Sequence, residues 1–204
     1  MVIDKTGKLI IRVPLRTPLA YIERALDKNR TWIHKSLSLW EKRELEKPKI
    51  NLADGELINF YGNSLKVVYC DSRLIEILGS ELRIPQRLAP NAKVFIRKFF
   101  RTQADTLIRQ RVTSYSQFME LYPTKVTMKD TSSRWGSCSG KKLAFCWRLI
   151  FAPPKVLDYV VVHELAHIAH PNHGVKFWQK VEAALSDYES SRRWLKLNGH
   201  KLAF

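Results

Sequence analysis

The chain has few cysteines and no long apolar run. Its three cysteines, Cys70, Cys138 and Cys146, form no CxxC pair. They are too few for a disulfide framework, which favours reduced thiols in a cytoplasmic protein. No stretch approaches the roughly 18 apolar residues of a membrane span. The first residues begin an alternating apolar pattern rather than a secretory signal. We therefore expect a cytoplasmic location and no membrane contact.

Acidic residues are also scarce. The chain has 19 Asp and Glu residues and 35 Lys and Arg residues, so its net charge is +16. Residues 97–142 alone hold ten basic and three acidic residues. This excess favours polyanionic partners, so DNA or RNA is a candidate partner, although a merely solvated basic surface would carry the same charge. A hydrophobic share of 45% excludes a disordered chain. Oligomeric state has no signal in the sequence.

Local patterns predict the order of the elements. Residues 9–14 read as a strand, and apolar residues at helical spacing predict a helix from Pro18 to the charged run near residue 41. Residues 55–69 and 72–85 read as hairpins that turn near Gly62-Asn63 and Gly79-Ser80. A basic helix is expected over about 92–121. Strands over 125–130 and 143–151 enclose a turn at 136–140, and Pro153-Pro154 opens a third helix.

Histidine is rare, yet four of the six histidines lie in the segment VVHELAHIAHPNHG, residues 161–174. On a helix, His163 and His167 lie one turn apart on the same face, where two imidazoles can bind one ion. Glu164 follows the first of them. This is the HExxH pattern, with two metal ligands and a glutamate that serves as general base for a water whose pKa zinc lowers to near 7.

A catalytic zinc also needs a third protein ligand. On a continued helix His170 would lie about 10 Å along the axis from His163, too far to share the ion. Moreover, Pro171 disfavours helical backbone at His170, so the helix should end there and the following turn can return His173 to the metal. His173 is therefore the preferred third ligand, and His170 is read as a nearby supporting or surface residue. The other candidates are Glu182, Cys138 and Cys146.

Three motifs, SSRWGSCS, CWRLIFAPPKVLDYVVVHELAH and NHGVKFW, resemble those of the YgjP-like zinc metallopeptidases, which are relatives of the SprT-type proteases. The resemblance covers most of the chain and is strongest over residues 131–185. It implies that His163, His167 and His173 bind Zn²⁺ and that Glu164 is catalytic. Cys146 and Gly174 depart from the family pattern, which usually has Asn and Ser there.

The expected fold class is α+β. We expect an N-terminal β-hairpin/helix lobe over residues 1–90 and a zincin-like catalytic domain over 91–204, in which the HExxH helix lies beside a small antiparallel sheet. Phe177 and Trp178 are read as core residues, and Trp135 as packing in preference to substrate contact. Arg134 and Arg148 are both candidates for binding a carboxylate or phosphate.

Three functions fit these patterns. The first is a zinc metallopeptidase that cleaves polypeptides, for which the basic surface suggests action near nucleic acid. The second is a metal-dependent ribonuclease of the YbeY type, which shares the histidine spacing but lacks a glutamate after the first histidine. The third is a basic nucleic-acid-binding module with structural zinc, although such zinc usually has four ligands rich in cysteine. Glu164 favours the peptidase.

Overall fold

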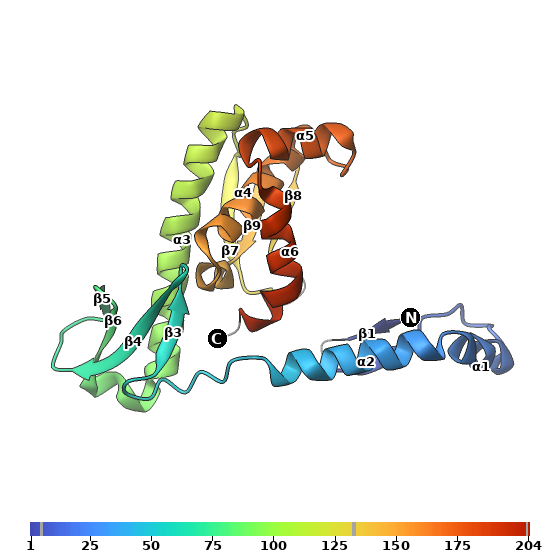
Figure 1. Cartoon of the computed structure of the whole chain (residues 1–204), viewed down its shortest axis with the longest axis horizontal. Coiled ribbons are helices and arrows are strands. Elements are labelled where there is room, and N and C mark those ends of the chain that lie inside the picture. Colours follow the sequence, from blue (N-terminus) through green and yellow to red (C-terminus); the bar gives the residue numbers. More distant parts are fainter. Residues whose placement is uncertain (5, 132–133, 203) are drawn as a thin grey trace. The chain divides into compact units, whose positions relative to one another are not determined.

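The structure is a computed structural model that describes residues 1–4, 6–131, 134–202 and 204. The chain divides into two compact units, Met1–Lys47 and Pro48–Phe204 (Figure 1). The sequence predicted a division near residue 90, whereas the internal contacts group residues 48–90 with the C-terminal part. Among the described residues, none of the helices combines the length and apolarity that a bilayer crossing needs.

The N-terminal unit consists of two short strands and two helices. Strand β1 (Val2–Ile3) pairs antiparallel with β2 (Leu9–Ile10), so the strand expected over residues 9–14 is shorter than predicted. The expected helix is divided into α1 (Leu19–Lys28) and α2 (Arg30–Leu45). Asn29 lies between them, and its side-chain amide donates to the carbonyl oxygen of Ala25. None of the described residues of either helix is buried.

The C-terminal unit begins with a four-stranded sheet in the order β3-β4-β6-β5. Its strands are β3 (Leu57–Phe60), β4 (Asn63–Cys70), β5 (Glu76–Leu78) and β6 (Glu81–Pro85). Both predicted hairpins are confirmed, since β3 pairs antiparallel with β4 and β5 with β6. Gly62 and Gly79, with φ of 82° and 59°, occupy the two turns in backbone conformations that glycine adopts without strain.

A second, three-stranded sheet has the order β7-β9-β8. Strand β7 (Lys125–Lys129) runs parallel to β9 (Lys142–Cys146), and β8 (Gly136–Ser139) runs antiparallel to β9. The prediction of an antiparallel sheet is therefore confirmed for the pair β8 and β9 and wrong for the pair β7 and β9. The segment expected as a turn is strand β8, and the chain reverses at Gly140 instead, where φ is 59°.

The apolar run after β9 also differs from the prediction. Trp147–Phe151 forms a short 3-10 helix, η2, rather than the end of a strand. All of these residues except Arg148 are buried, so the run lacks the alternation of a strand with one exposed face. Phe151 and Phe204 contact the ring of Phe100, which is fully buried.

Helix α3 (Ala92–Met119) follows the 3-10 helix η1 (Gln86–Asn91) and carries the longest buried stripe. Its buried residues recur mostly every fourth position: Ala92, Ile96, Phe100, Ala104, Ile108, Val112, Ser116 and Met119. The ring of Phe60, on β3, stacks on Phe100 at a centroid distance of 5.7 Å. This contact explains why the hairpin sheet belongs to the same compact unit as α3.

Helix α4 (Pro154–Ala169) is the central element of the unit. It contacts α3, strand β8, α5 (Val175–Ala184) and α6 (Tyr188–Asn198), which continues into the 3-10 helix η3 (Gly199–Lys201) (Figure 1). Ten of its sixteen residues are buried, so it has almost no solvent-facing side. A helix held on all sides in this way fixes the side chains of its last two turns.

Candidate metal centre

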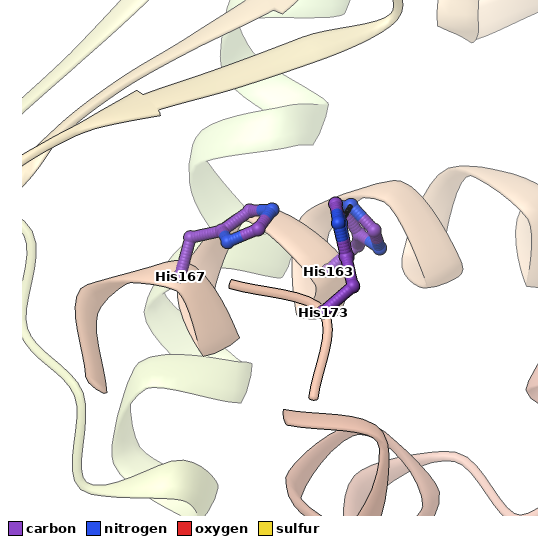
Figure 2. A group of neighbouring side chains, drawn as sticks. All are labelled: His163, His167 and His173. Carbon is purple, nitrogen blue, oxygen red and sulfur yellow. Dashed lines mark hydrogen bonds between the residues drawn. The ribbon is translucent and has the colours of Figure 1, made fainter. Parts of the chain in front are cut away.

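Three histidines converge where α4 ends. His163 and His167 lie one turn apart on α4, as predicted (Figure 2). His170 has extended backbone (φ −132°, ψ 96°), so the helix ends before Pro171, also as predicted. The loop that follows brings His173 back beside His163, directly before α5 begins.

The distances between the imidazoles suit one small ion. One ring nitrogen from each histidine can be chosen so that all three lie within 4.8 Å of one another. Nε2 of His163 and Nε2 of His173 are 3.1 Å apart. Two nitrogens on one tetrahedral zinc, each about 2.0–2.1 Å from the metal, would lie about 3.3 Å apart. The three side chains therefore fit a metal ion with little movement.

Hydrogen-bond partners orient two of the rings. Nδ1 of His167 lies 3.2 Å from the carbonyl oxygen of His170. A carbonyl only accepts, so Nδ1 carries the proton and the lone pair of His167 is on Nε2. Nδ1 of His163 lies 3.5 Å from the hydroxyl of Tyr159, one turn earlier on α4. His170 thus supports the site through its main chain.

Two aromatic side chains, Phe177 and Trp178, pack against the imidazole rings. The ring of Phe177 is fully buried, and its centroid lies 4.6–5.0 Å from those of all three histidines. Trp178 stacks on His173 at 5.7 Å, and the guanidinium of Arg192 lies 4.7 Å from the Trp178 ring. These two aromatic residues, expected in the core, therefore also fix the imidazole planes.

Burial controls the charge of the site. The pKa of His163 is lowered to about 3, first by burial and then by His167 and His173. Burial likewise lowers the pKa of His173. Both imidazoles are therefore neutral at physiological pH, which is the form that binds metals.

Glu164 is 6% exposed, and burial raises its pKa from 4.5 to about 7, although Arg134 acts in the opposite direction. Glu164 lines a cleft of about 530 Å³ together with His163 and His167. The carboxyl group and the imidazoles therefore face the same space.

Strand β8 forms a wall of this cleft. The other lining residues are Arg134, Gly136, Ser137, Cys138, Gly140, Lys141, Ile168 and Pro171. Because β8 is an edge strand of its sheet, one of its sides has no partner strand among the residues that the structure describes. Ser132 and Ser133 of the SSRWGSCS motif lie outside the described residues.

The remaining candidates have other surroundings. The three-histidine group includes neither Glu182 nor either of the two nearby cysteines. Cys138 lines the cleft, whereas Cys146 is buried with its sulfur 3.4 Å from the carbonyl oxygen of Thr131. Of the two candidate arginines, Arg134 lines the cleft. Arg148 pairs with Asp130 instead.

Sequence reasoning missed the contact between Gly136 and Glu164. A Cβ atom on Gly136 would lie 2.5 Å from both Cγ and Oε1 of Glu164. Only glycine lets β8 approach the carboxylate this closely. The sequence gives no sign of this, because the two residues are 28 positions apart and Gly136 reads as an ordinary turn glycine.

A helix that carries two histidines and a glutamate, followed by a returning third histidine, is typical of metal-dependent peptidases. The family model described as "YgjP-like, metallopeptidase domain" matches residues 1–198, and the chain belongs to this family. By family the protein is a metallopeptidase, which implies a metal cofactor, and the three histidines could hold it. The family resemblance read from the sequence is confirmed.

Two solved structures are similar to part of the chain. The metallopeptidase zymogen of Pyrococcus abyssi abylysin is 16% identical, covers 45% of this chain and 95% of its own, and has a TM-score of 0.40. The metallopeptidase zymogen of Methanocaldococcus jannaschii jannalysin is 22% identical, with coverages of 45% and 94% and the same TM-score of 0.40. These scores are too low to support a conclusion. A search of curated proteins finds no significant match.

Replacement of Gly136 by alanine should destabilise the protein by about 1–3 kcal/mol, because the new methyl group overlaps the Glu164 side chain. The cost should largely disappear in a Glu164→Ala background, where the overlapping atoms are gone. Urea unfolding of the four proteins in chelator measures this coupling. Gly174→Ala is the control, since nothing lies within 4 Å of its Cβ position. An equal cost in both backgrounds would place the strain in β8 itself.

The buried carboxyl group also predicts a pH-dependent stability in metal-free protein. Because the pKa of Glu164 rises from 4.5 to about 7 on folding, its contribution is most favourable below pH 4.5 and is lost as the pH rises through 7. Glu164→Gln should therefore be more stable than wild type by about 3 kcal/mol above pH 8, and the gap should close near pH 4. The histidines titrate in both proteins, so their contribution cancels in the difference between the two free energies of unfolding. A constant gap would show that the carboxylate is well solvated.

Proposed function

We propose that this protein is a zinc-dependent peptidase that hydrolyses polypeptides, with His163, His167 and His173 as metal ligands and Glu164 as general base. The observation that carries the proposal is the convergence of three imidazoles, two of which line one cleft together with the buried carboxyl group of Glu164. The expected cytoplasmic location is part of the same proposal.

The donor set suits a catalytic zinc. Neutral imidazole nitrogens are good zinc ligands, and three protein ligands leave the fourth tetrahedral position open. A structural zinc would be closed by a fourth ligand, usually cysteine, but the group of ligand atoms found among the described residues has none. This favours the peptidase over a binding module with structural zinc.

When bound, zinc polarises a carbonyl group and lowers the pKa of a water molecule that it holds. Glu164 supplies the proton transfer. Its carboxylate accepts a proton from the attacking water and then donates it to the leaving amine. In the metal-free protein burial raises the pKa of this carboxyl group to about 7, and a bound cation would favour its carboxylate form, which is the form that accepts the proton.

The cleft beside β8 suits an extended polypeptide. A substrate strand can pair with the free side of this edge strand and pass its scissile bond in front of Glu164. The same carboxyl group argues against the YbeY-type ribonuclease, because that family has no glutamate directly after its first histidine. The excess of positive charge adds nucleic acid as a proposed partner of the peptidase.

For the metal, His173→Ala should weaken zinc binding by at least about 100-fold, whereas His170→Ala should change it little. His170 contributes a main-chain carbonyl group, which alanine retains. Zinc stoichiometry and competition with a chromogenic chelator measure the affinities. Equal losses in the two variants would remove His173 from the ligand set, and unchanged binding in His173→Ala would favour Glu182 as the third ligand.

For catalysis, Glu164→Gln should keep its zinc and fold but lose about 10²–10⁴-fold of its turnover, because an amide cannot take a proton from water. The measurement is cleavage of a labelled unfolded protein alongside zinc content. Glu182→Gln, the same chemical change at an exposed position on α5, is the matched control. Full activity in the zinc-loaded Glu164→Gln protein would refute the role of Glu164. Cleavage of RNA but no polypeptide by wild type would favour the ribonuclease.

A further inference from the structure

A second large groove lies between α3 and strand β7. Its volume is about 800 Å³. Because β7 and β8 are the two edges of the three-stranded sheet, this groove is at the opposite edge from the catalytic cleft. Its lining residues are Val94, Arg97, Lys98, Arg101, Thr102, Asp105, Thr106, Arg109, Lys125, Val126, Thr127 and Met128. Five of them are cations and one is an anion.

Three of the five cations are available to a ligand. Arg97 pairs with Asp130, and Arg109 pairs with Asp105. Lys98, Arg101 and Lys125 are exposed, and none has an ion pair within the part of the chain that the structure describes. The groove thus keeps a net positive charge after its internal pairs are formed.

The charges are spread along the groove rather than gathered at one point. Lys98 and Arg109 are eleven residues apart on α3, which is about 17 Å along the helix. Arg109 donates a hydrogen bond to the carbonyl oxygen of Val126, the neighbour of Lys125, so the unpaired cations Lys98 and Lys125 lie towards the two ends of this length. One strand of duplex nucleic acid carries a phosphate about every 3.4 Å of its axis, so about five phosphates span this length. A polymer with regularly repeated negative charges therefore matches the groove better than a single small anion.

An acidic peptide strand fits less well. Such a strand would pair with the outer edge of β7. Arg109 already donates a hydrogen bond of 2.8 Å to the carbonyl oxygen of Val126 on this strand. The guanidinium group therefore covers a main-chain acceptor that an added strand would need.

The lining also distinguishes a duplex from a single strand. Proteins that bind single strands combine positive charge with aromatic side chains on which bases stack. None of the residues that line this groove is aromatic. Thr106 instead offers an exposed hydroxyl group, and a hydroxyl binds a phosphate oxygen without regard to base sequence.

We propose that the groove between α3 and β7 binds the phosphate backbone of duplex nucleic acid without reading its sequence. Lys98, Arg101 and Lys125 contact the phosphates. Binding there leaves the cleft beside β8 open, so the peptidase acts on polypeptides that lie near nucleic acid. The groove goes beyond the proposed peptidase function, and its binding does not depend on zinc or on Glu164.

The test is a fluorescence titration of the zinc-loaded protein with a labelled 20-base-pair DNA duplex at several salt concentrations. The variant Lys98→Glu/Arg101→Glu/Lys125→Glu should bind at least tenfold more weakly than wild type. Each lost phosphate contact should also flatten the slope of log affinity against log salt by about 0.9. Zinc content and peptide hydrolysis should be unchanged, which separates this outcome from a failure of the peptidase proposal.

The control is Lys66→Glu/Arg73→Glu/Lys155→Glu, which makes the same change of charge at three exposed positions outside the groove. It should keep most of the affinity. A glutamine version of the groove variant, with half the change of charge, covers the case in which the glutamate version does not fold. Equal losses in groove and control variants would overturn the proposal, because binding would then follow net charge alone. Tighter binding of a single strand, or displacement of the duplex by an equimolar acidic peptide, would also overturn it.

Discussion

The geometry of the site depends on one backbone constraint, the end of α4 at His170. Pro171 disfavours helical backbone at the residue before it, and His170 is extended. If the helix continued, the histidines would lie along it and could not surround one ion. Because it stops, His173 returns to within 3.1 Å of His163, and the freed carbonyl group of His170 accepts from the His167 ring. One proline thus fixes both the ligand geometry and the orientation of an imidazole.

The burial of α4 sets the protonation states of the side chains in the site. Strand β8 lies so close to the helix that Gly136 contacts the Glu164 side chain directly. The carboxyl group is desolvated, and its pKa rises towards neutrality. The same burial keeps the pKa of His163 low and its ring neutral. A single cause, the removal of water by packing, therefore produces a neutral ligand and a carboxyl group that can exchange protons near pH 7.

Helix α3 serves two purposes through its two faces. One face is a stripe of buried residues at intervals of mostly four, with Phe100 in contact with rings from three other segments. Another face carries four of the five cations that line the groove beside β7. The helix is therefore held rigidly on one side, which keeps the charges on the other side at fixed spacing. Fixed spacing matters for a ligand with regularly repeated charges, because each contact is then formed without reordering the protein.

The sequence by itself determined features whose causes act within a few residues. The hairpin turns at Gly62 and Gly79, the one-turn spacing of His163 and His167 and the helix end at His170 are of this kind. Only the tertiary structure decided that β7 runs parallel to β9, that Trp147–Phe151 is a 3-10 helix and that Gly136 contacts Glu164. Strand partners and close approaches between distant residues depend on how the whole unit buries its apolar surface. Local spacing and propensity do not contain that information, because burial is shared among segments far apart in the chain.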